Sequence, residues 1–529
     1  MKKWKYVTPL LVFALIAVIT CSKKEEEAGT SWTIIGYFDG NNNLDISQNN
    51  TSFTIEDVHE FEDVGSTDRV KVVVALGSLK TGGIVKYYLV EKHENELPDS
   101  ISSPVLQNLG TKDMSDPQTL KSFIEYAVSN YPADHYMLIV DDHGGGWRGV
   151  CVDEQNGAGD MMTLPELRGA IPDNVHFDII VFHACLMSMA EVAYELKDKA
   201  DYMVASEFTL PMQSVLGPGE WYLALTQNPD MSADELARKI VEAVYHAGEN
   251  KGKTVHMAAI DLSKMTALGS KVADFGNALV TESGDYWDEV LDAWNNTHYT
   301  QYDDPAFVDL REFAKIVKQE PHIGNIPLIK NAADSLVSCI NSAVLMTMTN
   351  AAGITRGGLT IHFPSSEDQF DSTNYVKLAF KSTNWYSFLS KFIHSTGGGG
   401  GGETVTISGT VSWPGHNLTA NCVAFLDTSH TSAIVGILPT QVDPQTGHYT
   451  IQFQLEGVLE AFVEAWDDVN GNGQMDAGDG FGFYDANGSG QMEWDDMLQI
   501  QPGQTLTGVD IELFTVSGDK PKKLKIPKR

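Results

Sequence analysis

Short apolar runs recur along the first two thirds of the chain and alternate with amphipathic segments. The runs are apolar at successive positions, as expected for strands of a parallel sheet that is covered by helices on both faces. The amphipathic segments suit the crossover helices that parallel strands need. We therefore predict an α/β fold, a layered sandwich around a mostly parallel sheet. The predicted strands are WTIIGYF from Trp32, RVKVVVAL from Arg69, HYMLIV from His135, FDIIVF from Phe177, DYMVAS from Asp201 and GLTIHF from Gly358.

The pattern changes twice towards the C-terminus. Residues 228–391 are mostly helical in periodicity and continue the α/β unit. Six glycines, Gly397–Gly402, follow and cannot contribute to a core. Short alternating segments separated by Gly, Pro and Asn then predict an all-β, sandwich-like module. We assign an α/β domain to residues 31–395, a glycine linker to 396–402, the β-module to 403–515 and a basic tail to 516–529.

The N-terminus has the features of an export signal. Three lysines precede an apolar run from Val7 to Ile19, which is too short to span a bilayer comfortably. The run is followed by Cys21 in a context that resembles a bacterial lipoprotein signal, where this cysteine would be acylated, although Thr20 departs from the usual small residue. A plain secretory signal with an incidental cysteine is the alternative. We expect an export signal in residues 1–21 and a polar tether in residues 22–30.

Charge and cysteine usage narrow the classes of partner. The formal net charge of -35 disfavours binding to nucleic acid or to an anionic membrane surface, because both need clustered Lys and Arg. Cations and basic peptides are the favoured partners. The five cysteines have no regular spacing, so we predict neither a disulfide scaffold nor a zinc site. We expect no organic cofactor.

Two candidate catalytic residues follow neighbouring predicted strands, at the edge where a parallel sheet carries its functional groups. His143 comes after HYMLIV, and Gly144 next to it can bring its amide close to a developing oxyanion. Cys185 follows FDIIVF at a predicted strand-to-helix junction, where the helix dipole and His143 would lower the thiol pKa. Taken alone, His143 could be an ordinary polar histidine, and Cys185 could be an inert buried cysteine. Together they predict a thiolate nucleophile with a histidine base.

The segments around these residues, YPADHYMLIVDDHGGGW and FHACLMSMAEVAYELKDKADYMVASE, resemble the clostripain family of caspase-like cysteine peptidases. The resemblance begins at Trp32 and continues to GGLTIHFP, so it covers residues 31–395. It implies a caspase-like fold and an endopeptidase that cleaves protein or peptide substrates through a Cys-His dyad and a thioester. Cys185 would be the nucleophile and His143 the proton shuttle. We expect the amides of Gly144 and Cys185 to hold the oxyanion.

One position departs from the family pattern. Members usually carry Asp two residues before the nucleophile, in an acidic pocket for Arg or Lys, but His183 occupies that position here. Residues two apart on a strand share a face, so His183 should line the substrate pocket beside Cys185. Cleavage after Arg or Lys is therefore in doubt. Glu207 is a candidate replacement acid, and His183 itself is an alternative base.

Two segments of the β-module match the spacing of calcium loops. Both end in Asp instead of the bidentate Glu and lack long flanking helices, so we expect modest affinity and no EF-hand pair. Polar hairpin turns are the alternative. The turn from Asp39 to Asp45 likewise either ligates calcium or forms a polar turn. The predicted ligands are Asp468, Asn470, Asn472, Asp476 and Asp479 in the first loop and Asp485, Asn487, Ser489, Glu493 and Asp496 in the second.

Two functions remain open at this point. The first is an exported, lipid-anchored endopeptidase with a calcium-stabilised β-module, and the presence of both His143 and Cys185 favours it. The second is a catalytically inactive surface adhesin that binds through the β-module, and His183 keeps it open. The resemblance also implies frequent calcium dependence and self-cleavage between the His and Cys segments. Arg148 and Arg168 are the basic residues of that interval.

Overall fold

The computed structural model describes residues 30–516, except for 48, 94–98, 212, 298–299, 367–368, 397–402, 428–439, 456–457, 471–476, 487, 489–495 and 502. The predicted export signal with Cys21, nearly all of the tether, the six glycines and nearly all of the basic tail lie outside the described residues. Within the described part of the chain, no helix is long and apolar enough to cross a membrane.

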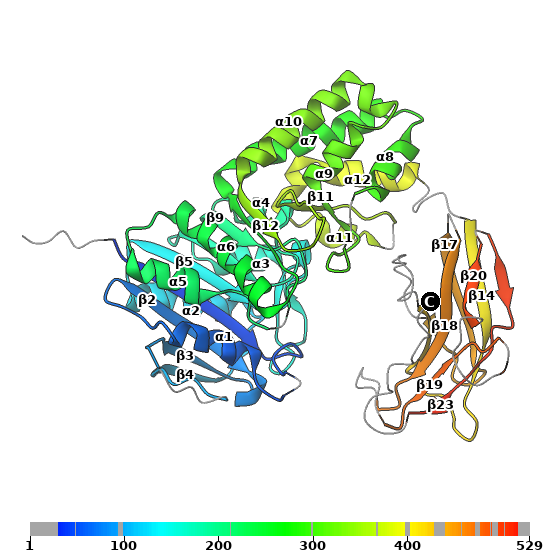
Figure 1. Ribbon diagram of the computed structural model, residues 1–529, viewed down its shortest axis with the longest axis horizontal. Helices are drawn as coiled ribbons and strands as arrows, with labels where there is room; N and C mark the ends of the chain where they lie inside the picture. Colours follow the sequence, from blue (N-terminus) through cyan, green and yellow to red (C-terminus); the bar gives the residue numbers. More distant parts are fainter. Residues whose placement is uncertain are drawn as a thin grey trace, which may run out of the picture.

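A nine-stranded sheet forms the centre of the α/β domain, in the order β12-β10-β9-β8-β5-β1-β2-β3-β4 (Figure 1). Five adjacent strands are parallel, and two antiparallel strands extend the sheet at each edge. The predicted mostly parallel sheet is confirmed. The parallel strands are β9 (Ala200–Ala205), β8 (Phe177–His183), β5 (His135–Asp141), β1 (Trp32–Gly40) and β2 (Val70–Ser78). The edge strands are β3 (Ile84–Leu89), β4 (Val105–Thr111), β10 (His256–Asp261) and β12 (Val344–Thr349).

Alternate side chains of the central strands enter two hydrophobic cores, one on each face of the sheet. In β1, Ile35 and Tyr37 join one core while Ile34 and Phe38 join the other, and all four are fully buried. Burial on both faces explains why the strands are apolar at successive positions. The first core includes α2 (Pro117–Asn130), α3 (Leu164–Ala170) and α4 (Ala190–Leu196), and the second includes α1 (Phe53–Glu62), α5 (Pro218–Gln227) and α6 (Ala233–Lys251).

A mostly helical region follows β10 and extends the first core. The prediction of a central strand in GLTIHF is wrong, because only β13 (Thr360–His362) is extended and it pairs with β11 (Phe307–Asp309) in a separate two-stranded sheet. The amide of Thr360 donates to Ser188 O over 2.9 Å, so the segment bonds to the chain after β8 instead of the sheet edge. The helices are α7 (Met265–Glu282), α8 (Trp287–Asn295), α9 (Leu310–Val317), α10 (Pro327–Ala343), α11 (Ser372–Tyr375) and α12 (Trp385–Ser395).

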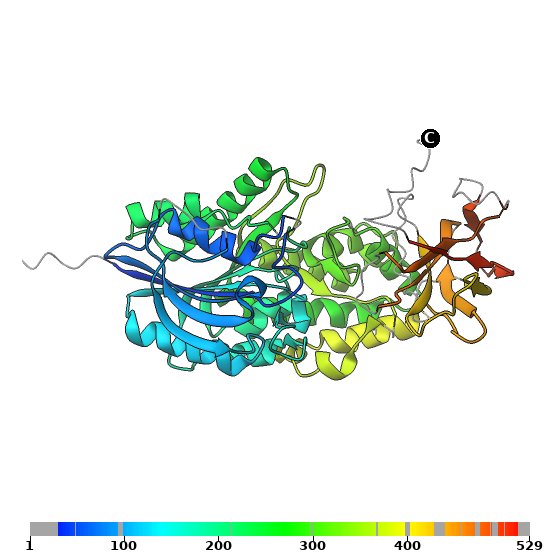
Figure 2. The same cartoon turned by 90° about the horizontal axis from the view of Figure 1, so that it is seen from below.

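The C-terminal β-module has two sheets around its own hydrophobic core (Figure 2). One sheet has the order β17-β14-β21 and the other β16-β15-β18-β19-β23, with β22 beside β14 and β20 beside β18. A separate β-module, as predicted, is present. Its strands are β14 (Glu403–Ser412), β15 (Cys422–Asp427), β16 (Thr440–Gln441), β17 (His448–Leu455), β18 (Leu459–Asp467), β19 (Gly480–Phe483), β20 (Leu498–Ile500), β21 (Thr505–Thr507), β22 (Ile511–Glu512) and β23 (Phe514–Thr515).

Candidate active site

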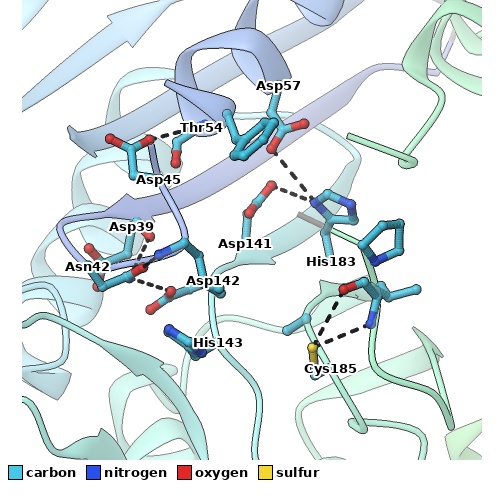
Figure 3. A pocket seen from close by; sticks show the side chains of 15 residues that line it. Asp39, Asn42, Asp45, Thr54, Asp57, Asp141, Asp142, His143, His183 and Cys185 are labelled. Carbon is cyan, nitrogen blue, oxygen red and sulfur yellow. Dashed lines mark hydrogen bonds and ion pairs between the residues drawn. The ribbon is translucent and has the colours of Figure 1, made fainter. Parts of the chain in front are cut away.

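A pocket of about 100 Å³ lies at the carboxyl ends of β1, β5 and β8 (Figure 3). His143 follows β5, Cys185 follows β8, and both line this pocket together with His183, the last residue of β8. The strand register pairs Asp141 with His183, so the two segments leave the sheet side by side. The structure thus brings His143, Cys185 and His183 to one pocket.

The glycine after His143 lets two backbone segments touch. A Cβ atom added at Gly144 would lie 2.2 Å from the carbonyl oxygen of Cys185 and 3.0 Å from its nitrogen, so only glycine permits this approach. Gly144 and Val150 pair as an isolated bridge whose hydrogen bonds come from the residues on either side. The N–H of Gly144 is not used by the bridge.

Cys185 sits on a sharp turn immediately after the sheet. Leu186 has a φ of 64°, in the left-handed region that costs a residue with a side chain about 1–2 kcal/mol. Its amide donates to Phe208 O over 3.0 Å, which helps to hold the turn. Helix α4 begins only at Ala190, so the expected placement of Cys185 at a helix N-terminus is wrong. The intervening residues form the turn instead of the first helical turn.

The surroundings of Cys185 favour the neutral thiol. Burial raises the thiol pKa above its ordinary value, and the carboxylate of Asp142 adds to this increase. The amide of Leu210, which donates to Sγ over 3.4 Å, opposes the increase but does not cancel it. The prediction of a lowered thiol pKa is therefore wrong in the resting site, because desolvation outweighs the backbone hydrogen bonds from Leu210 and from Cys185 itself.

His143 is held by a residue that the sequence analysis did not single out for this role. Its Nε2 lies 2.8 Å from Oδ1 of Asn43, in the turn after β1. Burial lowers the imidazole pKa, although the nearby Glu154 opposes this shift. Among the hydrogen bonds of the described residues, none joins the imidazole to the Cys185 thiol. The resting pair is thus a neutral imidazole and a neutral thiol.

The three consecutive asparagines after β1 fasten this turn to the His143 segment. Asn41 Nδ2 donates to Asp153 over 2.9 Å, and Asn42 Nδ2 donates to Asp142 over 2.6 Å. The backbone N–H of Asn43 donates to the Glu154 carboxylate over 3.1 Å. These contacts join the turn to the His143 segment, and calcium binding by the same turn stays a prediction. The turn positions the histidine segment from the neighbouring strand.

Three buried polar side chains meet at the end of the pocket away from His143 (Figure 3). His183 Nδ1 lies 2.8 Å from Asp141 Oδ2 and 3.9 Å from Asp57 Oδ2, and Asp57 comes from α1. Burial lowers the imidazole pKa of His183, but the charge and hydrogen bond of Asp141 together with the charge of Glu60 outweigh it, so the net shift is upward. Burial and Asp141 raise the pKa of Asp57 well above its ordinary value.

Glu207, the predicted replacement acid, does not line this pocket. It is buried elsewhere, where its Oε1 accepts from the amide of Gly358 over 2.6 Å and its Oε2 lies 3.5 Å from Arg356 Nη1. Arg356 also pairs with Asp303. Glu207 therefore belongs to a buried ion-pair cluster away from the pocket. The acids beside His183 are Asp57 and Asp141 instead.

The described parts of the two predicted calcium loops close in the same way. Asp479 accepts from the amide of Val469 over 3.1 Å, and Asp496 accepts from the amide of Ala486 over 2.9 Å. In each loop the side chain of the acid at position twelve thus accepts a hydrogen bond from the backbone N–H of the residue at position two. Asp468, Asn470 and Asp485 are also described, whereas Asn472, Asp476, Asn487, Ser489 and Glu493 lie outside the described residues.

Comparison with known proteins places the α/β domain in a family. The model of the clostripain family matches residues 37–392, which include His143 and Cys185. The chain belongs to the clostripain family. Clostripain from Hathewaya histolytica is 37% identical over 148 residues, a match that covers 24% of this chain and 26% of that protein. The matched part thus spans about a quarter of the length of this curated relative.

A solved structure agrees with this placement at the level of the fold. A secreted C11 cysteine protease from Bacteroides thetaiotaomicron, in complex with an irreversible peptide inhibitor, superposes with a TM-score of 0.51. The sequence identity is 22%, and the superposition covers 68% of this chain and 99% of the other. The caspase-like fold that the resemblance implied is confirmed.

Proposed function

We propose that this member of the clostripain family is an exported cysteine endopeptidase with Cys185 as the nucleophile and His143 as the proton shuttle. The observation that carries the proposal is the meeting of these two side chains at one pocket, from the ends of neighbouring parallel strands. An inactive adhesin would have no need to keep an imidazole, a thiol and a close-packed glycine at this place.

The chemistry starts from a neutral pair. As Cys185 Sγ attacks the peptide carbonyl, its proton passes to His143, so no stable thiolate is required beforehand. Asn43 Oδ1 accepts a hydrogen bond from the protonated Nε2 of His143, which leaves Nδ1 free to take the proton from the thiol. The amides of Gly144 and Cys185 hold the oxyanion. His143 then protonates the leaving amine, and water hydrolyses the thioester.

The pocket acids support cleavage after a basic residue. Asp57 and Asp141 lie at the end of the pocket. The pKa of Asp57 is raised in the empty pocket, and the positive charge of an arginine or lysine side chain would lower it again, so that both acids can face the substrate as carboxylates. His183 bonds to Asp141 and leaves Asp57 as the carboxylate less engaged by the imidazole. The acidic character of the pocket is thus provided by α1 and β5, and an acid at residue 183 is not required.

A covalent probe tests the peptidase proposal. A peptidyl acyloxymethyl ketone with arginine or lysine before the warhead should label the full chain, and Cys185→Ala should abolish the labelling. Cys339→Ala, which removes another partly exposed thiol, is the matched control and should be labelled normally. Absence of labelling across a diverse set of peptides would support the adhesin instead.

Export, lipid anchoring and calcium binding belong to the same proposal. Acylation of Cys21 would hold the enzyme at the bacterial envelope, where protein or peptide substrates would reach it. In the β-module, the matching closure of the two loops by Asp479 and Asp496 supports calcium as a structural cofactor. The wild-type chain should incorporate labelled fatty acid and Cys21→Ala should not, and equal incorporation by the two chains would contradict the anchor.

A further inference from the structure

The deep end of the pocket gathers metal-ligating atoms from three separate elements. Nδ1 of His183 and one carboxylate oxygen each of Asp57 and Asp141 all lie within 4.8 Å of one another. All three side chains are buried, and each also lines the pocket. The second carboxylate oxygen of Asp57 is buried without a hydrogen-bond partner. Leaving a buried carboxylate oxygen unpaired costs free energy, so this oxygen indicates a missing ligand.

We propose that Asp57, Asp141 and His183 form a site for a divalent transition-metal ion, with Zn²⁺ as the best fit, and that the bound ion blocks the substrate pocket. The blocking part of this inference rests on the proposed peptidase function, whereas the metal site itself does not. An imidazole nitrogen and carboxylate oxygens are ligand types that zinc binds, and three protein ligands leave the fourth position of a tetrahedral ion open to the pocket.

The spacing of the ligand atoms suits a tetrahedral ion. Metal–ligand bonds of about 2.1 Å give a tetrahedron with edges of about 3.4 Å. The two measured edges, from His183 Nδ1 to Asp141 and to Asp57, are 2.8 Å and 3.9 Å and lie on either side of this value. Shifts of about half an ångström would bring these two edges to the tetrahedral value, and the third edge, between the two carboxylate oxygens, is within 4.8 Å.

The nitrogen ligand decides the class of metal. Calcium and magnesium prefer sites made of oxygen alone, while imidazole favours zinc and related transition metals. Three carboxylates, which an aspartate at 183 would create, would favour the harder cations instead. The unexpected His183 is thus the residue that makes the site selective for a transition metal.

A bound ion would move one proton of the metal-free site. The Nδ1 proton of His183 now lies between the ring and Asp141, and the amide of Val215 contacts Nε2 at 3.5 Å. On binding, the ion takes the Nδ1 position and the proton passes to Nε2. This costs the Val215 contact, which is at the outer limit of a hydrogen bond, and the Nε2 proton must then turn away from the Val215 N–H, since both are donors.

A bound ion and a basic substrate side chain would compete for the same carboxylates. Both are cations, and both need Asp57 and Asp141 at the end of one small pocket. Micromolar zinc should therefore inhibit cleavage after arginine or lysine competitively, by raising KM without lowering kcat. This pattern differs from that of zinc bound to the Cys185 thiol, which would lower kcat.

The binding test uses the full chain with Cys185→Ala, in calcium, so that neither the thiol nor the β-module loops take up the probe ion. Co²⁺ and Zn²⁺ are titrated by visible absorption and calorimetry. We expect one ion per chain, with tetrahedral Co²⁺ bands, and binding at least about tenfold weaker in His183→Asn and in Asp57→Asn. His135→Asn is the matched control, because His135 pairs with one carboxylate, that of Asp178, at 2.6 Å.

The outcomes decide the proposal. Unchanged binding in His183→Asn, or no binding at all, would overturn it. If the pocket variants are destabilised, anomalous diffraction from a Zn²⁺-soaked crystal of the Cys185→Ala chain locates the ion directly, and an ion outside the pocket would also overturn it. Because the Cys185→Ala chain is inactive by design, these results stand apart from any failure of the peptidase proposal.

Discussion

Replacing Gly144 by alanine should disable the site through a single backbone contact. The added Cβ would lie 2.2 Å from the carbonyl oxygen of Cys185, whereas a close carbon–oxygen contact is about 3.3 Å. The two segments must therefore separate by about 1 Å. They carry the nucleophile, the histidine and the two amides proposed for the oxyanion, so one displacement disturbs all of them.

The magnitude follows from the cost of misplacing catalytic groups. A shift of about 1 Å can lower the rate about 100-fold, which corresponds to about 2.7 kcal/mol of lost transition-state stabilisation. Overpacking should also lower the free energy of unfolding by about 1–3 kcal/mol. The assay is kcat/KM on a fluorogenic peptide with arginine or lysine before the cleaved bond, together with thermal melts at the assay conditions.

Gly169→Ala is the matched control, because nothing lies within 4 Å of a Cβ at that position in α3. It should leave both activity and melting temperature near those of the native chain. If Gly144→Ala keeps kcat/KM within twofold of the native value, the close packing of the two segments does not position the catalytic groups. The account of the oxyanion site would then be refuted.

Three further predictions concern other parts of the molecule. Asn43→Ala should lower kcat about tenfold with little change in KM, since it frees the His143 ring. Asn130→Ala, at an exposed position at the end of α2, is the control and should leave both kcat and KM unchanged. Burial raises the pKa of Glu191 to about 7, so this residue favours the folded state most at a pH below its unfolded pKa. As the pH rises from 4.5 through 7, the free energy of unfolding should fall by up to about 3 kcal/mol. Urea titrations of Glu191→Gln should show that this pH dependence is removed. Chelation of calcium should lower the melting temperature of the β-module in the full chain, and an unchanged melt would exclude structural calcium in its two loops.

The strand ends could be predicted from the sequence because the physics is local. Strands buried on both faces are apolar at successive positions, and parallel strands put His143 and Cys185 at one edge of the sheet. The same reasoning wrongly predicted a strand of the main sheet at GLTIHF, where the short β13 lies. Its apolar residues are buried against α4 and the helical region, and an apolar run does not identify its partner strand.

The rest of the site depends on contacts between distant segments. Asp57 reaches the pocket from α1, far from Cys185 in sequence, and no spacing rule predicts that approach. Glu207 was placed beside the nucleophile by proximity in sequence, but its partner Arg356 lies about 150 residues later and draws it into another cluster. The thiol pKa was misjudged for a similar reason, because burial is a property of the assembled fold.

The most direct test of the central claim is a crystal structure of the chain after reaction with an arginyl acyloxymethyl ketone. We predict a thioether at Cys185 Sγ, the inhibitor carbonyl oxygen beside the amide of Gly144, the His143 ring within hydrogen-bonding distance, and the guanidinium against Asp57 and Asp141. An adduct on another residue, or one at Cys185 with His143 turned away from the inhibitor, would contradict the account.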